Sequence, residues 1–296
     1  MDDLDTRLLV DLLRDRIRPD SSLGQHFLID DEVISRSVDI ASRMSPLDTD
    51  SHVLEIGPGP GSLTLALLRT GARVTAFEVD DESVDHLQRV FGDAEGRLDV
   101  QKVDALEAVW PADVTHIVAN LPYQISSPVL ERIQRHHAEH PMAVVVLLLQ
   151  EEFADRMAIG RDRAALSPLG LSLWLDFEVE LDAKVPPHSF SPSPRVSSRL
   201  TSMRPVDREP GIDRRMFRTI TQHCFANRRR KLRTLLSKPP RRIGRIRGWH
   251  RRRWSEAADN VIRASPEGLP EGWLDLRPEN LETSHWVSLV DAISSN

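Results

Sequence analysis

Between His52 and Leu149, short apolar segments alternate with amphipathic ones, and this alternation constrains the fold more than any other feature of the sequence. Apolar runs of strand length are typical of buried strands, and three- to four-residue spacing is typical of the helices that cover them. The predicted strands are residues 53–56, 73–79, 98–103, 116–119 and 143–149, and the predicted helices are residues 63–68, 82–90 and 129–137. The pattern predicts an α/β fold, a Rossmann-like sheet of mostly parallel strands in a three-layer arrangement.

Further elements lie on either side of this region. Leucines at helical spacing near the N-terminus predict an amphipathic helix that ends by Pro19, and residues 31–44 predict a second helix. Residues 171–181 and 196–203 are interpreted as two late strands that flank a proline-rich loop. These strands complete the predicted sheet.

Two prolines and a glycine within residues 204–211 indicate a linker. The pattern after it is helical, with no strand signal. We therefore expect a first domain over residues 1–204 and a small helical domain over residues 212–296.

Positive charge is concentrated in this expected second domain. The chain has a net charge of −6, yet residues 214–253 carry 16 Lys and Arg and no Asp or Glu. A block of one sign attracts a polyanion, because each phosphate contact releases condensed counterions. The alternative is a solvated basic face that binds nothing.

The composition excludes several classes of protein. Cys224 is the single cysteine, which rules out an internal disulfide framework and a site built from several thiolates. The longest apolar stretch, Met142 to Leu149, is too short to cross a membrane, and no secretory signal is visible. Histidines show no ligand-type spacing, so we expect no metal site. We expect a cytoplasmic monomer.

A glycine-rich turn, Gly57-Pro58-Gly59-Pro60-Gly61, follows the first predicted strand and precedes a helix. Glycines permit a tight turn and a close approach of the backbone to a ligand. Glu78 ends the next predicted strand, where a carboxylate can bind the ribose hydroxyls of a nucleoside cofactor. Ser62 replaces the third glycine of the dinucleotide fingerprint, which favours S-adenosylmethionine over a nicotinamide cofactor. The alternative is a structural strand–helix turn without a ligand.

Asp104 ends the third predicted strand, beside Glu78 on the same edge of the sheet. Its carboxylate is expected to accept a hydrogen bond from the adenine amino group of the cofactor. A carboxylate at this position can also simply cap a helix.

The loop after the fourth predicted strand begins Asn120-Leu121-Pro122-Tyr123. The amino group of adenine is a poor nucleophile, because its lone pair is delocalised into the ring. We expect the side-chain carbonyl of Asn120 and the backbone carbonyl of Leu121 or Pro122 each to accept one N–H, which aims the lone pair at a methyl group. Tyr123 offers a ring on which an extruded base can stack.

Phe190 opens a second proline-rich loop, which runs to Ser198. Its ring is expected to face the extruded adenine from the side opposite Tyr123. The alternative is an aromatic side chain that fills space under the loop.

Four motifs in this order resemble the ribosomal RNA adenine N6-dimethyltransferase family, the KsgA-type enzymes that act on the small subunit. The motifs are Gly24-Gln25-His26-Phe27-Leu28, Glu55-Ile56-Gly57-Pro58-Gly59, Asn120-Leu121-Pro122-Tyr123 and Phe190-Ser191-Pro192-Ser193-Pro194-Arg195-Val196. The basic run Arg228-Arg229-Arg230-Lys231 also resembles the RNA-binding element that follows the family's linker. His26 stands where bacterial members usually have Asn, which indicates an archaeal origin.

The resemblance implies a methyltransferase sheet, S-adenosylmethionine as cofactor, and two adjacent adenines near the 3′ end of small-subunit rRNA as substrate. It implies cofactor contacts at His26, Leu28, Gly57, Gly59, Glu78, Asp104 and Asn120. It further implies a partner, the pre-mature small ribosomal subunit, and a role in ribosome biogenesis.

Two other functions remain open from the sequence. A related, resistance-type methyltransferase modifies an adenine of large-subunit rRNA and usually carries Ile at the position of Leu121. A non-catalytic ribosome assembly factor could share the same fold. The rRNA that accepts labelled methyl groups, and the activity of an Asn120→Ala variant, distinguish these functions.

Overall fold

The computed structural model describes residues 4–15, 25–159 and 166–296 and divides into two compact units. The first comprises residues 1–155 and 178–205, and the second comprises residues 156–177 and 206–296. No helix in the described ranges is long and apolar enough to span a bilayer.

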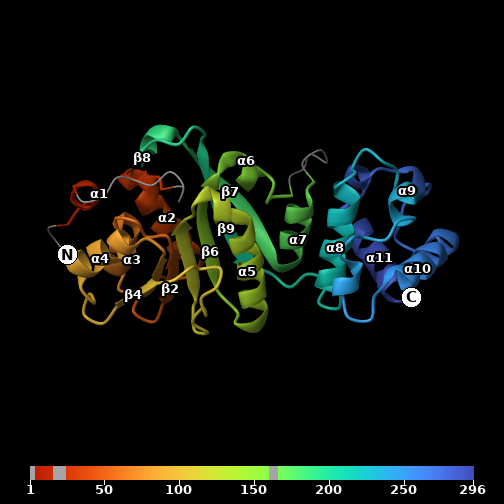
Figure 1. Ribbon diagram of the computed structural model, residues 1–296, viewed down its shortest axis with the longest axis horizontal. Helices are drawn as coiled ribbons and strands as arrows, with labels where there is room; N and C mark the ends of the chain where they lie inside the picture. The colour runs from red at the N-terminus through yellow and green to blue at the C-terminus, as the bar shows by residue number, and fades with distance from the viewer. Residues whose placement is uncertain (1–3, 16–24, 160–165) are drawn as a thin grey trace. The chain divides into compact units, whose positions relative to one another are not determined.

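The first unit is an α/β unit (Figure 1). Its strands are β1 (Phe27–Leu28), β2 (His52–Ile56), β3 (Arg73–Glu78), β4 (Leu98–Lys102), β5 (His116–Asn120), β6 (Val144–Gln150), β7 (Phe177–Val185), β8 (Phe190–Ser191) and β9 (Ser198–Pro205). Its helices are α1 (Thr6–Arg14), α2 (Asp31–Met44), α3 (Ser62–Arg69), α4 (Asp81–Phe91), α5 (Ser126–Glu139) and α6 (Glu151–Asp155), with the short 3₁₀ turns η2 (Tyr123–Ile125) and η4 (Pro187–Ser189).

Seven strands form one sheet in the order β4-β3-β2-β5-β6-β9-β7. The five strands from β4 to β6 are parallel, and β9 pairs antiparallel with β6. The central strands are buried along their length, as expected for a parallel sheet covered by helices. The order reverses direction between β2 and β5, so the loops after these strands diverge and leave a crevice at their carboxyl ends.

A separate two-stranded sheet brings together segments that are far apart in the sequence. Phe27 pairs with Ser191, and Leu28 pairs with Phe190, in antiparallel register. This pairing places the chain around His26 beside the proline-rich loop that follows Phe190.

The regular elements in the described residues of the second unit are all helices, apart from Phe177 at the start of β7. It contains α7 (Pro168–Asp176), α8 (Arg214–Phe225), α9 (Leu232–Leu236), α10 (Arg251–Ala264) and α11 (Thr283–Ser294), with the 3₁₀ turns η5 (Ile243–Arg245), η6 (Trp273–Asp275) and η7 (Pro278–Asn280). Four tryptophans are buried in its core: Trp249, Trp254, Trp273 and Trp286. The Trp254 ring donates from Nε1 to the carbonyl of Leu236 at 3.0 Å, which fixes α10 against α9.

The structure confirms the predicted Rossmann-like α/β fold with a small C-terminal helical part. One strand prediction is partly wrong: within residues 171–181, the first six residues belong to α7, and β7 begins only at Phe177. Ser167 caps this helix by accepting from Gly170 N–H at 2.9 Å, and Pro168 occupies its first turn. The helix is almost entirely apolar, so its sequence lacks the periodicity that separates a helix from a buried strand.

The division of the chain also differs from the expected boundaries of 1–204 and 212–296. Residues 156–177 belong to the second unit, because α7 packs against α8 and contributes Leu171 and Leu175 to the second core. Pro19 and Gly24, which figured in the sequence predictions, lie outside the described residues.

Candidate active site

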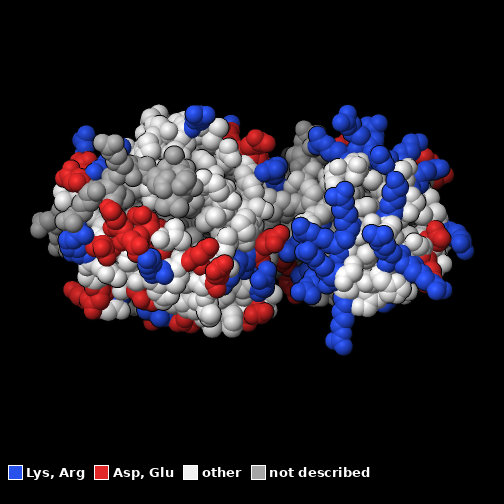
Figure 2. Space-filling view, viewed as in Figure 1, with Lys and Arg blue, Asp and Glu red and all other residues white. Residues whose placement is uncertain are grey.

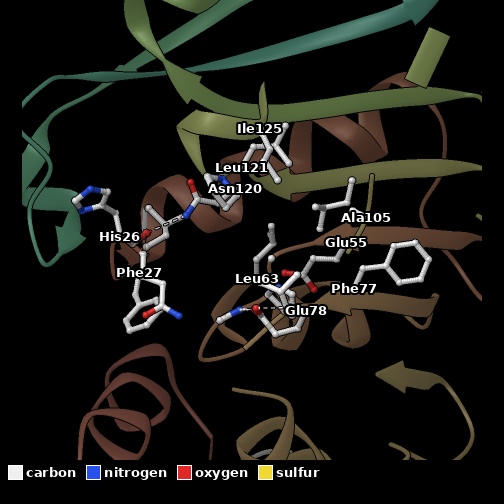
Figure 3. A pocket seen from close by; sticks show the side chains of 18 of the residues that line it. His26, Phe27, Glu55, Leu63, Phe77, Glu78, Ala105, Asn120, Leu121 and Ile125 are labelled. Carbon is white, nitrogen blue, oxygen red and sulfur yellow. Dashed lines mark hydrogen bonds between the residues drawn. The ribbon is translucent and has the colours of Figure 1, made fainter. Parts of the chain in front are cut away.

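A cavity of about 370 Å³ opens at the carboxyl ends of β2, β3, β4 and β5. Figure 3 shows the side chains that line it, which come from the loops after these strands and from the segment around β1. Its volume falls in the range of about 300–1,000 Å³ that is usual for small-molecule sites. Ten predicted residues border this cavity: His26, Leu28, Gly57, Gly59, Glu78, Asp104, Asn120, Leu121, Pro122 and Tyr123.

The glycine turn after β2 forms one wall of the cavity. Gly57, Gly59 and Gly61 have φ values of +70°, +53° and +87°, in the left-handed region that other residues rarely adopt. A Cβ atom at Gly61 would lie 2.6 Å from the Phe91 ring and 2.7 Å from the Leu87 side chain, so both of these α4 side chains would have to shift. The predicted tight turn therefore requires glycine for its conformation and, at Gly61, for close packing.

Glu78 lies at the end of β3, and its carboxylate is held by three backbone N–H groups. Oε1 accepts from Val79 at 2.8 Å and from Asp80 at 3.0 Å, and Oε2 accepts from Gly59 at 3.2 Å. Burial raises the pKa of Glu78, while these hydrogen bonds favour the ionised form and lower it. A carboxylate has about four acceptor positions, so about one remains for a hydroxyl group of a ligand.

Glu55, on β2, is a second carboxyl group in the same wall, and it is fully buried. Its Oε2 accepts a hydrogen bond of 2.6 Å from the hydroxyl of Thr64. Burial raises the pKa of Glu55 to about 8, so the group is mostly protonated at neutral pH. Glu55 belongs to a predicted motif, but its neutral state could not be predicted, because that state depends on burial.

Asp104 borders the cavity just beyond β4, next to Glu78 on the neighbouring strand. One of its oxygens, Oδ1, accepts from Leu106 N–H at 2.8 Å, so the residue also caps the turn that follows. Its capping role and its place in the cavity wall coexist.

Asn120 lies at the carboxyl end of β5, and its amide orientation is fixed by a neighbour. Nδ2 donates to the backbone carbonyl of His26 at 3.1 Å, as the dashed line in Figure 3 shows. Because the amide nitrogen is engaged there, Oδ1 is the end that remains as an acceptor. This amide orientation is compatible with the predicted acceptor role of Asn120, which stays a prediction.

The backbone carbonyls of the Asn120 loop differ in availability. The Pro122 carbonyl already accepts from Ile125 N–H at 3.1 Å and closes the turn η2. Leu121 donates its own N–H to Leu148 at 3.2 Å, which fixes the start of the loop to β6. Of the two carbonyls proposed from the sequence, that of Pro122 is thus already engaged once, and the choice between the two stays a prediction.

Tyr123 is half-buried and contacts two other segments. Its hydroxyl shares a hydrogen bond of 2.7 Å with the hydroxyl of Ser198, and its ring stacks against the His26 ring at a centroid distance of 5.9 Å. Burial raises the pKa of Tyr123. His26 is itself held by a 2.8 Å hydrogen bond between Nδ1 and the carbonyl of Pro192. The neighbour of the Tyr123 ring is thus His26.

Phe190 has a different environment from the one expected. It is 2% exposed, belongs to the main hydrophobic core and pairs with Leu28 across the small sheet. Among the described residues, those that border the cavity do not include Phe190. Its position matches the space-filling alternative, and a stacking role would require its ring to move.

Several apolar cavity residues were not predicted. Val79, Ala105 and Ile125 directly follow polar residues of the motifs or lie within two positions of them, and Phe77 and Leu63 complete the apolar surface. Their proximity in sequence to Glu78, Asp104 and Tyr123 was an available signal. No pattern specific to each residue marks it, since buried apolar residues are common at strand ends.

The predicted RNA-binding residues lie in the second unit, in the turn between α8 and α9. Arg228, Arg229, Arg230 and Lys231 are all exposed, and α8 ends before them at Phe225. Lys231 pairs with Asp275 at 2.8 Å, whereas no ion pair to Arg228, Arg229 or Arg230 is seen among the described residues. Figure 2 shows Lys and Arg side chains gathered over the face of this unit.

The cavity suits S-adenosylmethionine in the polar and apolar groups that line it. Carboxylates at the ends of two neighbouring strands suit a ribose and an adenine amino group, and the apolar side chains of Val79 and Ala105 suit the faces of an adenine ring. Within the described ranges, no group of three or more His, Cys, Asp or Glu side chains is arranged to hold a metal ion.

Comparison with known proteins gives one consistent result. Residues 17–243 match the family described as ribosomal RNA adenine dimethylase. The chain is 35% identical over 281 residues to the "Probable ribosomal RNA small subunit methyltransferase A" of Methanopyrus kandleri, with 94% of both chains covered. It is 36% identical to the protein of the same name from Haloarcula marismortui, over 85% of this chain and 83% of the relative.

Solved structures agree on the fold. The dimethyladenosine transferase from Plasmodium falciparum superposes with a TM-score of 0.71 at 22% identity, covering 89% of this chain and 96% of that one. The 23S rRNA methyltransferase ErmE superposes with a TM-score of 0.59 at 26% identity, covering 90% and 98% of the two chains. Similar curated proteins come from both archaea and bacteria, so the archaeal origin stays a prediction.

Proposed function

The chain belongs to the ribosomal RNA adenine dimethylase family, and from this premise we propose that it dimethylates N6 of two adjacent adenines in small-subunit rRNA. It is an adenine methyltransferase, and S-adenosylmethionine is its methyl donor. The proposed target is a hairpin loop near the 3′ end of that rRNA, modified during ribosome biogenesis. Bases in such loops are extruded at little cost.

The orientation of the Asn120 amide is the observation that carries the mechanism. Because Nδ2 is engaged by the His26 carbonyl, Oδ1 can accept one N–H of the target amino group. The carbonyl of Leu121 accepts the other N–H, since that of Pro122 already accepts from Ile125. Two acceptors on the two N–H bonds hold the nitrogen lone pair in a fixed direction.

When bound, S-adenosylmethionine supplies an electrophilic methyl group on its sulfonium centre. Glu78 and Asp104 bind the nucleoside part in this proposal, and the glycine turn brings the backbone close to it. Tyr123 supports the target base, with its hydroxyl held by Ser198. No side chain needs to act as a strong base, because the N6 proton becomes acidic as the new N–C bond forms.

The second unit binds the rRNA phosphates in this proposal. Arg228, Arg229 and Arg230 are exposed and form no ion pair among the described residues, so their charges are available to the nucleic acid. The partner is a small ribosomal subunit before its maturation is complete, and the site of action is the cytoplasm, where such particles are assembled.

The experiment is a transfer assay with labelled S-adenosylmethionine and separate small- and large-subunit particles from cells that lack this protein. We expect label in two adjacent adenines of the small-subunit rRNA, as dimethyladenine. Label in large-subunit rRNA alone would assign the chain to the resistance-type activity. No label in either RNA, together with retained binding of the small subunit, would identify a non-catalytic assembly factor.

A further inference from the structure

A loop of the first unit, residues 104–113 between β4 and β5, carries Asp104 and Ala105 into the wall of the cavity. These residues form no helix or strand that would fix their positions, yet they border a binding site. The contacts that fix its shape therefore bear on the ligand.

Arg132, on α5, reaches across to this loop with both terminal nitrogens. Nη1 donates to the carbonyl of Leu106, and Nη2 donates to the carbonyl of Ala108. The planar fork of arginine suits such a pair of acceptors, and lysine cannot reproduce it. A single side chain from a rigid helix thus holds two points of the loop, two and four residues after Asp104.

Trp110 completes the arrangement under the same guanidinium group. The Arg132 guanidinium carbon lies 5.2 Å from the centre of the Trp110 ring, in the range of a cation–π contact. The indole Nε1 donates to the carbonyl of Ala105 at 2.9 Å, and the side chain is 5% exposed. Trp110 therefore closes the loop on itself, and Arg132 holds the closed loop against α5.

Asp104 is part of this closed structure. Its Oδ1 accepts from Leu106 N–H at 2.8 Å, and its carbonyl accepts from Ala108 N–H at 2.8 Å. The residues whose carbonyls Arg132 binds are thus the same residues whose N–H groups orient Asp104. Burial and the charge of Arg135 lower the pKa of Arg132, and the charge of Asp104 acts in the opposite direction.

We propose that Arg132 is a positioning residue for the adenine end of the cofactor cavity, acting through Asp104. Arg132 is not expected to touch the cofactor, and it is absent from the residues described as bordering the cavity. It sets the position of the Asp104 carboxylate. The inference rests on the proposed function only for the identity of the ligand, because the loop contacts are independent of any RNA.

The test is the dissociation constant of S-adenosylmethionine, and separately of adenosine, measured by calorimetry on the full chain without RNA. We expect Arg132→Gln to raise the dissociation constants of both ligands about tenfold, which is the scale of one lost polar contact. Arg132→Lys, which keeps the charge and loses the fork, should weaken them by a similar factor. Full affinity in the lysine variant would overturn the role of the two carbonyl contacts.

A double-mutant cycle separates positioning from a general structural effect. In an Asp104→Asn background, Arg132→Gln is expected to add little further loss of affinity, because both changes remove the same contact. Losses that multiply would show that Arg132 acts independently of Asp104 and would overturn the proposal. Arg89→Gln, the same change at an exposed position on α4, is the matched control and should bind both ligands normally.

A second variant guards against misfolding of the Arg132 variants. Trp110→Phe keeps an aromatic ring and removes the hydrogen bond to Ala105. It should therefore also raise the dissociation constant of adenosine, by a smaller factor than Arg132→Gln. Unchanged binding in this variant would contradict the closed-loop argument. If the wild type binds the cofactor and these effects appear while no rRNA is methylated, the proposed function fails and this inference stands.

Discussion

The polar groups of the cavity and the charged groups of the basic surface are held in opposite ways. In the cavity, Asn120 is tied to His26, Glu78 to three N–H groups and Glu55 to Thr64. On the second unit, arginines at 228–230 are exposed and form no ion pair among the described residues. The difference separates two tasks: chemistry needs side chains of fixed orientation, and phosphate binding needs charges that the protein does not neutralise. Substitutions in the two regions should therefore change different measurements.

Asn120→Ala is expected to have the largest effect. It removes an acceptor aimed at the reacting nitrogen, and loss of one such group in other enzymes lowers kcat by about 10²–10³. We expect methylation of small-subunit rRNA to fall by this factor while the affinity for rRNA is unchanged. The measurement is single-turnover methyl transfer, with Asn260→Ala on the surface of α10 as control. A variant that methylates at the wild-type rate would remove Asn120 from the mechanism.

The buried carboxyl group of Glu55 should make the stability of the protein depend on pH. Its pKa is raised from 4.5 to about 8, so its contribution to stability is complete below pH 4.5 and is lost as the pH rises through about 8. Glu55→Gln keeps the acceptor for Thr64 and cannot titrate, so its stability should not fall in this window. The expected difference between wild type and variant is on the order of a few kcal/mol across these pH values.

Chemical unfolding of both proteins at intervals from pH 5 to pH 9 measures this difference. Subtracting one profile from the other removes the contribution of the histidines to the pH dependence of stability. These include His52 and His116, whose pKa values are lowered by burial. Parallel profiles would mean that Glu55 is ionised in the folded protein at neutral pH.

Glu78→Gln tests the cofactor half of the cavity. The amide keeps one acceptor oxygen for the backbone N–H groups but loses the charge, and a hydrogen bond to a charged group is worth about 1.5–3 kcal/mol. The dissociation constant of S-adenosylmethionine should rise about ten- to hundredfold, with kcat recovered at saturating cofactor. A fall in kcat that cofactor cannot restore would show that Glu78 also fixes the reacting geometry.

Substitutions of the exposed arginines should have the smallest effect per residue, and that effect should appear in the salt dependence of rRNA binding. Replacing Arg228, Arg229 and Arg230 with Gln is expected to weaken rRNA binding and to lower the slope of log affinity against log salt by about 0.7–0.9 per lost phosphate contact. Cofactor binding should not change. Arg233→Gln is the matched control, because Asp275 already pairs with this guanidinium. An unchanged slope in the triple variant would make these arginines a solvated face.

Much of the first unit could be predicted because each prediction used a local pattern. The strands and the glycine turn follow from periodicity and from the backbone freedom of glycine, and the carboxylates follow from their positions at strand ends. Leu171–Asp176 could not be assigned correctly, because an apolar helix has no polar face to show its period. The role of Ser167 as a helix cap was the signal that distinguished the two possibilities.

It was easier to predict which residues form the site than how their side chains are arranged. That Phe190 is buried beside Leu28 depends on a strand pair between residues more than 160 positions apart, which no local pattern specifies. The neutral state of Glu55 depends on burial, and the orientation of Asn120 depends on a carbonyl 94 positions away. Local sequence identifies candidate residues, and tertiary contacts decide their protonation and direction.

The pairing of β1 with β8 also has a consequence for biosynthesis. Phe27 emerges from the ribosome early, but its partner Ser191 emerges only after the whole parallel sheet has been translated. The ring of His26 and the carbonyl of Pro192 that holds it therefore cannot meet before then. A nascent chain therefore completes this wall of the cavity late, after all five parallel strands have been synthesised.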